Sequence, residues 1–464
     1  MICNYSIFSM PILLKRISSL FLALLMLSFS LKAQEKISLQ RAIELALQNN
    51  LQIKQAQLSE ALSDETIKQS RFALLPTLNA SNSENYSIGR VFDQLSGQPI
   101  NQAVTSANGS LNSSLVVFQG FQRRNQILQN KLNLEADKSN TRKAQNDLSL
   151  TVVTTYLQVL SGQDLVTATT QQLEFAREQL AREQRFFDVG DRTLADLAQS
   201  KAQLSTAELN LTNAQNQVDL AFLNLSQLME MAPGSRFDVE SPVVNSIGQI
   251  NNQFTADQIY AQALENYPDI KLAEFRRLSA EKAIEIAKGG LMPRLNLSGN
   301  LGSGYSSARK QVIAGTTPPV FETISLRDQV RDNYNRALGF SLNIPIFNGY
   351  QARSTVNRAK INFVSASLTE DLAKNNLNKV INQAIFDLRA AEKRYVSTQS
   401  AFESSDAAFN VIKQRYDVGL VNSLDYNQSQ INLNQAQFNL IQAKYDLIFR
   451  NKLIDFYMGK PLTF

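Results

Sequence analysis

The sequence contains no histidine and a single cysteine, Cys3, among its 464 residues. Histidine is the commonest general base and the commonest metal ligand in proteins, so its absence removes the usual centre of acid–base and metal chemistry. No nucleophile, base and metal ligand can be assembled from the remaining residues at a recognisable spacing. We therefore expect no catalytic site, no cofactor and no metal site.

The N-terminus has the pattern of a secretory signal peptide. Lys15 and Arg16 precede an apolar run of 15 residues, 17–31, which is shorter than the ~20 residues that a membrane-spanning helix requires. We expect residues 1–33 to be removed by cleavage after Ala33, so that the mature chain begins at Gln34. Cys3 lies before the apolar run, so the mature chain carries neither a lipid-bearing cysteine nor a disulfide.

The positive charge of the chain lies mostly in this leader. Its removal takes away Lys15, Arg16 and Lys32 and no acidic residue, so the formal net charge falls from +5 to +2. No basic stripe with interleaved aromatic residues remains. We therefore expect no nucleic-acid partner.

The chain is an internal duplication. The stretch FDVGDRTLADL at 187–197 returns as YDVGLVNSLDY at 416–426, 229 positions later, and upstream the two copies match at an offset of 217. The second copy therefore has twelve extra residues. These lie between Ser298 and Phe347, because VFQG at 117–120 already pairs with IFNG at 346–349 at the later offset.

Proline and glycine are absent over long spans in both copies. The span 351–418 contains neither residue, and 121–189 contains only Gly162. Because both residues disfavour helix interiors, each copy is predicted to hold a helix of about 65 residues, ~100 Å long. After the Gly190 and Gly419 turns a second helix follows, with a heptad seam of apolar and small residues that Arg450 interrupts in the second copy. Each copy is a predicted helical hairpin.

Other segments alternate with the period of a β-strand. Three such segments are clear, at 107–117, 295–305 and 334–346, and a fourth at 78–88 is less regular. One face of each is apolar and the other is uncharged and polar, which is typical of a membrane barrel wall and less so of a soluble sandwich. Four strands cannot close a barrel, and lipid does not tolerate an open edge, so the chain must oligomerise. Two copies would give eight strands and three would give twelve, and the pattern alone leaves both open.

The combination resembles the TolC-like outer-membrane efflux proteins. The features that carry the resemblance occur in the same order in both copies. They are AIELALQNNLQIKQAQ (42–57) and YAQALENYPDIKLAE (260–274), LLPTLNAS and LMPRLNLS before a strand, a Phe-x-Gly sequence closing a hairpin, and the Val-Gly turn. The resemblance implies a mixed α+β membrane channel. In it, duplicated long helical hairpins form a periplasmic α-barrel, and four β-strands per chain contribute to a trimeric 12-stranded β-barrel in outer-membrane lipid.

The resemblance also implies a function and partners. The chain would be the passive exit duct of a tripartite efflux or type I secretion system, a homotrimer docked to a periplasmic adaptor protein and an inner-membrane pump. The alternative is a coiled-coil scaffold or adhesin of the envelope that conducts nothing. That alternative predicts the helices but not the four amphipathic strands.

The expected organisation follows the two copies. The segments are the signal peptide, 1–33; a first repeat, 34–233, with an opening helix, a strand hairpin at about 76–119 and a helical hairpin at about 120–231; a linker in the equatorial region, 234–255; and a second repeat, 256–464, with a strand hairpin at about 293–347 and a helical hairpin at about 349–458.

The repeated turn is the candidate functional site. By the resemblance it lies at the periplasmic tip, where Val189, Gly190, Val418, Gly419 and Leu420 would close the hairpins and dock the adaptor. The segment GDRTLAD resembles the family's gate sequence, which makes Arg192, Asp196 and Asp425 gate candidates.

Three observations leave the gate residues open. Thr193 with Asp196, and Asn422 with Asp425, have the spacing of helix N-caps, so the two aspartates could serve only to cap. Gln199 stands where the family has a second acid. The arginine also lies in the first copy rather than the second, which leaves open which hairpin lines the pore.

Overall fold

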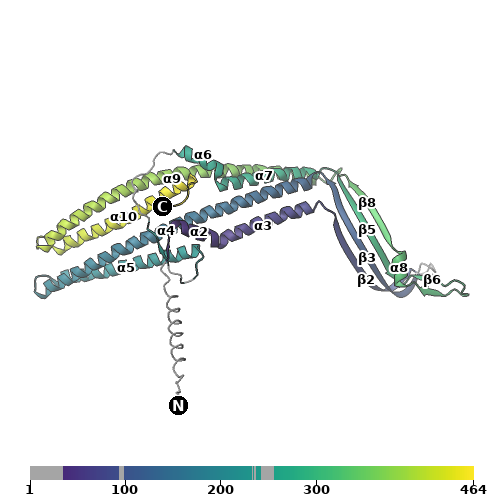
Figure 1. Cartoon of the computed structure of the whole chain (residues 1–464), viewed down its shortest axis with the longest axis horizontal. Helices are drawn as coiled ribbons and strands as arrows, with labels where there is room; N and C mark the ends of the chain where they lie inside the picture. Colours follow the sequence, from purple (N-terminus) through teal and green to yellow (C-terminus); the bar gives the residue numbers. More distant parts are fainter. Residues whose placement is uncertain (1–34, 93–98, 233, 235–236, 242–254, 464) are drawn as a thin grey trace, which may run out of the picture. The chain divides into compact units, whose positions relative to one another are not determined.

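The computed structural model describes residues 35–92, 99–232, 234, 237–241 and 255–463 (Figure 1). The expected signal peptide and most of the expected linker lie outside these residues. The chain divides into two compact units, each built from both copies. Unit 1 comprises the chain up to Lys54, Ala144–Glu265 and Leu377–Phe464; unit 2 comprises Gln55–Lys143 and Asn266–Asn376.

Two helical hairpins account for most of the helix. Their long arms, α4 (Gln122–Asp188) and α9 (Gln351–Asp417), have 67 residues each, and their short arms, α5 (Leu194–Leu228) and α10 (Ser423–Tyr457), have 35 each. Gly162 lies within α4 without ending it. A Cβ atom added there would lie 3.1 Å from Val218, so the glycine lets α5 approach α4 closely.

The seam of each hairpin is buried where the heptads place small residues. Ala207, Ala214 and Ala221 on α5 are buried, as are Ala436 and Ala443 on α10. Arg450, which interrupts the second seam, points to two acids instead. It donates to Asp387 at 2.8 Å and to Asp446 at 3.2 Å, so its charge is compensated.

A short pair of parallel strands packs into the core of unit 1. β1 (Glu35–Ile37) pairs in parallel with β4 (Phe237–Val239), beside α2 (Leu39–Asn49). The fully buried Tyr156 of α4 places its hydroxyl 2.9 Å from the carbonyl of Ile37 and 2.8 Å from that of Glu240. The hydroxyl therefore holds both strands against the helix.

The opening helix of each copy is two helices in the structure. The first copy has α2 and then α3 (Leu51–Phe72), and the second has α6 (Ala256–Asn266) and then α7 (Pro268–Gly289). Asn50 accepts a hydrogen bond from the backbone N–H of Gln52 at 2.9 Å, which caps a new helix start. In the second copy Pro268 disfavours helical conformation at the preceding residue and begins the new helix.

Four helical segments of unit 2 lie side by side in the order α3, α4, α7, α9 (Figure 1). Ser63 of α3 bonds Asp137 of α4. Gln129 of α4 donates to the carbonyl of Ser279 in α7 at 3.2 Å, and Arg277 of α7 pairs with Glu370 of α9 at 2.6 Å. Among the described residues of this unit, α3 and α9 are therefore the edges of the layer.

Unit 2 also holds a four-stranded antiparallel sheet in the order β2-β3-β5-β8 (Figure 1). The strands are β2 (Thr77–Phe92), β3 (Pro99–Gln119), β5 (Arg294–Ser306) and β8 (Asn335–Asn343). The last strand ends earlier than the expected 334–346. Ile344 is followed by Pro345, which has no N–H to donate to a ladder.

The register sorts the side chains by face. Residues paired across neighbouring strands form transverse rows whose side chains lie on the same face. One face is polar, with rows such as Asn79–Asn112–Asn300 and Ser81–Ser110–Gly302. The other face is apolar, with rows such as Leu115–Leu297–Phe340. We call these the polar face and the apolar face. On the polar face Ser81 and Ser110 share a hydrogen bond of 2.8 Å.

The sequence between β5 and β8 is more structured than an ordinary hairpin loop. It contains β6 (Lys310–Val312), β7 (Phe321–Thr323) and the short helix α8 (Leu326–Asp332). Gln329 of α8 is buried and bonds the backbone of Ser306 in both directions. The twelve extra residues of the second copy fall in the interval that holds these elements.

We expect Tyr156→Phe to lower the free energy of unfolding by about 1–3 kcal/mol, because the buried carbonyl of Ile37 and the partly buried carbonyl of Glu240 lose their shared donor. Hydrogen exchange at the amides of β1 and β4 should accelerate, and the apparent melting temperature in detergent should fall. Tyr395→Phe is the matched control, since its hydroxyl bonds no other described residue. Equal exchange rates in the two variants would contradict this role.

Candidate functional site at the hairpin turns

The two repeated turns end their long helices in the same way. Gly190 has φ +81° and Gly419 has φ +77°, the left-handed conformation that suits glycine. Asp191 N–H donates to the carbonyl of Phe186, and Leu420 N–H donates to that of Arg415, each at 2.9 Å. These bonds cap both helix C-termini.

The turns expose apolar side chains. Val189 is 77% exposed, Val418 69% and Leu420 70%. These residues are not used to bury the hairpin seams. They form a small exposed apolar surface at each turn.

Several contacts join the two hairpins near their turns. Arg182 of α4 donates to Asp417 of α9. Gln179 donates to the hydroxyl of Tyr416 at 2.9 Å, and Ser423 donates to Asp196 at 2.6 Å. Both ends of each turn are thus attached to the other hairpin.

A fully buried carboxylate lies at the centre of these contacts. Glu183 accepts hydrogen bonds from the hydroxyl of Tyr416 and from Gln179, the latter at 2.9 Å. Its other oxygen lies 3.8 Å from Nε of Arg192, and the Arg192 guanidinium lies 5.4 Å from the centre of the Tyr416 ring. A buried carboxylate needs such partners, because an uncompensated charge in the interior is costly. Burial, and then the hydrogen bond with Glu183, raise the pKa of Tyr416 to about 12.

Sequence reasoning identified Arg192 but not Glu183 or Tyr416. The duplication carries the signal that could have found them. At the offset of 229, Glu183 corresponds to Ile412, a seam residue, and Tyr416 corresponds to Phe187. An acid that replaces an apolar seam residue in only one of two copies indicates a specific partner.

Asp196 both caps a helix and links the hairpins. One oxygen accepts from the backbone N–H of Thr193 at 3.1 Å, and Thr193 accepts in turn from Asp196 N–H at 3.2 Å, which forms a complete capping box. The other oxygen accepts from Ser423. The bond from Ser423, followed by those from Thr193, holds the pKa of Asp196 below its ordinary value.

The structure does not bring Asp425 into this cluster. Asp425 lies exposed in the first turn of α10, where its backbone N–H donates to the capping side chain of Asn422 at 2.8 Å. Its carboxylate makes no ion pair with another described residue. Of the three gate candidates, Arg192 and Asp196 therefore lie at the contact between hairpins, and Asp425 lies outside it.

Polar side chains are buried along α10 below this contact. Ser423, Asn427 and Gln430 are each at most 7% exposed. Neither amide atom of Asn427 has a hydrogen-bond partner among the described residues, and the same holds for the hydroxyl of the buried Ser200 on α5. Buried polar groups without partners weaken packing.

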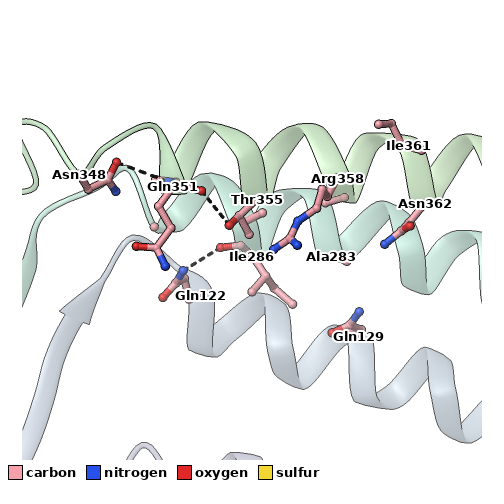
Figure 2. Close-up of a pocket in the computed structure, with 14 residues that line it drawn as sticks. Gln122, Gln129, Ala283, Ile286, Asn348, Gln351, Thr355, Arg358, Ile361 and Asn362 are labelled. Atoms are coloured by element: carbon pink, nitrogen blue, oxygen red, sulfur yellow. Dashed lines mark hydrogen bonds between the residues drawn. The ribbon is translucent and has the colours of Figure 1, made fainter.

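A cleft of about 690 Å³, lined by both polar and apolar side chains, lies in unit 2 between α4, α7 and α9 (Figure 2). Gln122 points into it and donates to the carbonyl of Ile286 at 2.9 Å (Figure 2). Among the described residues that line it, Arg358 is the one ionisable side chain, so they include no acid paired with a base. Over the described part of the chain, no three His, Cys, Asp or Glu side chains lie close enough to hold a metal ion. None of the described helices is both long and apolar enough to cross a membrane.

Several curated proteins and solved structures are similar to this chain. It is 24% identical over 392 residues to the outer membrane efflux protein BepC of Brucella suis, covering 84% of this chain and 78% of that protein. It is 26% identical over 418 residues to the outer membrane protein TolC of Escherichia coli, covering 86% and 78%.

Among solved structures, the outer membrane protein VceC of Vibrio cholerae matches with a TM-score of 0.73 and 17% identity, covering 91% of this chain and 96% of that one. A membrane protein from Pseudomonas aeruginosa matches with a TM-score of 0.75 and 20% identity, covering 91% and 93%. These likenesses show the fold.

The family assignment rests on both copies of the duplication. The sequence matches the outer membrane efflux protein family over residues 42–229 and 259–459. Its members are channel-type proteins rather than enzymes. The chain belongs to the outer membrane efflux protein family.

Proposed function

We propose that three copies of this chain form the outer-membrane exit duct of a tripartite efflux or type I secretion system. The single observation that carries the proposal is the open sheet of unit 2, together with the helices of 67 residues that follow it. One face of the sheet is apolar, and the other is polar and uncharged apart from Arg294 at the start of β5. As a member of its family, the chain resides in the outer membrane with a large periplasmic helical portion. We propose that it works without catalysis and without a cofactor.

The two faces of the sheet suit lipid on one side and water on the other. The polar face carries asparagine, serine, threonine and glycine over most of its length, as in the row Thr77–Ser114–Ser298–Gly339. Such a lining admits water and solutes without strong selection by charge. The apolar face, with Leu338 and Phe340 more than 70% exposed, would meet hydrocarbon.

The edges of unit 2 favour three copies. β2 and β8 each have one neighbour in the sheet, so each leaves a row of backbone groups unpaired. Eight strands from two copies would enclose a space that side chains fill, whereas twelve leave a wider lumen. The edge helices carry matching exposed residues, Leu58 and Leu62 on α3 and Ile361, Leu368 and Leu372 on α9, each at least 58% exposed.

We assign the gate and the docking surface to the hairpin turns. Arg192 and Asp196 lie in contacts that hold the two hairpins together, next to buried polar groups that pack weakly. Asp425 is exposed at the same end and is available to a neighbouring copy. We assign docking of the adaptor to Val189, Gly190, Val418, Gly419 and Leu420. The apolar side chains of Val189, Val418 and Leu420 protrude from the turns, and the two glycines cap the helices that end there.

The purified protein in detergent should have the mass of a trimer, and it should conduct ions in a planar bilayer. Light scattering and single-channel recording measure the two properties. A monomer would contradict the barrel. A trimer that conducts nothing, with the tip variants described below as inactive as the wild type, would favour the envelope scaffold.

We expect Arg192→Ala to raise single-channel conductance several-fold and to sensitise cells to large antibiotics. The substitution removes the cation beside buried Glu183, and contacts to charged groups contribute about 1–3 kcal/mol. The trimer should persist, because the helical seams are untouched. Arg185→Ala is the matched control, since Arg185 bonds only a carbonyl of its own helix. Equal conductance in both variants would exclude Arg192 from the gate.

Ser423→Ala and Thr193→Ala separate the two roles of Asp196. The first removes the bond between hairpins and leaves the capping box, so conductance should rise at nearly unchanged stability. The second removes the cap and should cost about 1 kcal/mol of stability, with a smaller effect on conductance. If Ser423→Ala leaves conductance unchanged, Asp196 serves only as a cap.

The same contact sets a pH dependence. Because the folded pKa of Asp196 lies below its ordinary value of 3.8, the contact contributes fully above that value and is lost as pH falls through the lowered pKa. Conductance of the wild type should therefore rise in that acidic range. Ser423→Ala should lack most of this rise, and an equal rise in both proteins would show that other groups cause it.

A further inference from the structure

Two side chains of opposite charge lie on the apolar face of the sheet, one on each edge strand. Glu84 on β2 is opposite Ala107 and is followed on the same face by Tyr86 and Ile88. Arg336 on β8 is opposite Leu301. Both are exposed, and neither makes an ion pair with another described residue. The other charged residue of this face in the described strands, Arg90, is six residues beyond Glu84 along β2, or ~20 Å away.

Charges in such positions need a partner. A charged side chain on the lipid face of a barrel is destabilising, more so far from the interfaces. Arg336 lies 5.1 Å from the ring centre of Tyr334, which offers partial compensation, but Glu84 has none of this kind. The opposite signs on opposite edges suggest that each charge meets the other when the edges join.

We propose that Arg336 of one copy pairs with Glu84 of the neighbouring copy across the β8–β2 seam, and that this pair stabilises the seam at a stagger of four or six residues. The inference rests on the trimeric barrel proposed above. Its occupant is a second copy of this chain, because only there does the open edge of β8 find a complementary strand edge with a carboxylate on the same face.

The geometry of barrel closure supports the pairing. Within one copy the register places Arg336, Leu301, Leu111 and Ala80 in one transverse row. In a barrel with tilted strands, a transverse row that is followed once around returns to its first strand at a different residue, and we call this shift the stagger. For twelve strands about 4.8 Å apart and tilted by about 35–45°, the stagger is roughly 12–17 residues. Each copy contributes a third of this stagger, about four to six residues.

The alternation of faces restricts the stagger to even values, four or six. Counted from Ala80, a stagger of four places Glu84 directly opposite Arg336. A stagger of six places it opposite Leu338, diagonally next to Arg336. Long side chains reach each other in both arrangements.

The direction of the stagger also agrees. Ser307 N–H donates to the carbonyl of Thr105 at 2.8 Å, and Thr105 lies on the apolar face. Consider the sheet seen from the apolar face, with the Phe92 end of β2 upward, so that β3 runs downward. In this view the carbonyl of an L-residue on β3 whose side chain faces the viewer points to the left. The bond from Ser307 therefore places β5 to the left of β3. The right-handed tilt of barrel strands then displaces the next β2 toward higher residue numbers, from Ala80 toward Glu84.

Engineered cysteines test the register, because the expected mature chain has none of its own. Glu84→Cys combined with Arg336→Cys should form a disulfide between copies if the stagger is four, and Glu84→Cys with Leu338→Cys if it is six. Leu78→Cys with Arg336→Cys is the matched control on the same strands and face, and it should not cross-link. Denaturing gels should show covalently linked trimers for one of the first two pairs.

Charge exchange tests the interaction itself. Glu84→Arg and Arg336→Glu should each shorten the half-life of the heated trimer roughly tenfold or more, since a close charge pair becomes a repulsion. The double exchange should recover most of the loss. If instead Arg336 binds a lipid phosphate, Glu84→Gln leaves the half-life unchanged and the double exchange recovers nothing, which overturns the proposal.

The outcomes distinguish this inference from the proposed function. Trimers of the expected mass that conduct normally, with neither of the first two cysteine pairs cross-linked, would overturn the register and leave the exit duct standing. Absence of trimers in the wild type would overturn the proposed function and this inference together.

Discussion

The unpaired backbone at the two edges of the sheet is the constraint on which the rest of the structure depends. β2 and β8 each have one hydrogen-bonded neighbour, and in hydrocarbon every unpaired N–H and C=O would cost several kcal/mol. One copy therefore cannot remain alone in lipid. The proposed closure by other copies would explain which face meets lipid and why the opposite face is polar and almost uncharged. It would also explain why the edge helices α3 and α9 keep exposed leucine and isoleucine.

The duplication then supplies two hairpins of equal length that need one another. A helix of 67 residues is about 100 Å long, far more than one small core can cover. Alanine in both seams, together with Gly162 against Val218, lets each short arm lie close to its long arm. The similar packing of the two hairpins makes a stiff scaffold. Contacts that only one hairpin can make come from residues that differ between the two copies. Glu183, which replaces the seam residue Ile412 of the other copy, is one such difference.

Much of this could be predicted from the sequence, for identifiable reasons. The long helices follow from missing glycine and proline, and the amphipathic strands follow from their alternation; the family comparisons confirm the fold class. The separate helices α2 and α3 were not predicted, because the break at Asn50 depends on one capping bond to Gln52. The partners of Arg192 were also missed. Glu183 and Tyr416 are 233 residues apart, and only the packing of two hairpins shows that they share a hydrogen bond.

The hairpin turns combine rigid and weak parts in a way that suits the gate proposed above. Each turn is itself fixed, since Gly190 and Gly419 cap their helices with complete sets of backbone bonds. The contact between hairpins is different in kind. It consists of a few polar bonds around Glu183 and Asp196, beside Asn427 and Ser200, whose buried polar atoms lack partners. Separating the hairpins would let water reach those atoms and the Glu183 carboxylate, which offsets part of the lost hydrogen bonding. An apolar seam would gain nothing comparable on opening, so the same length of alanine-rich contact would hold the tip shut more firmly. In the proposed gate, the polar contact would therefore let the turns move as rigid bodies at a modest cost in free energy.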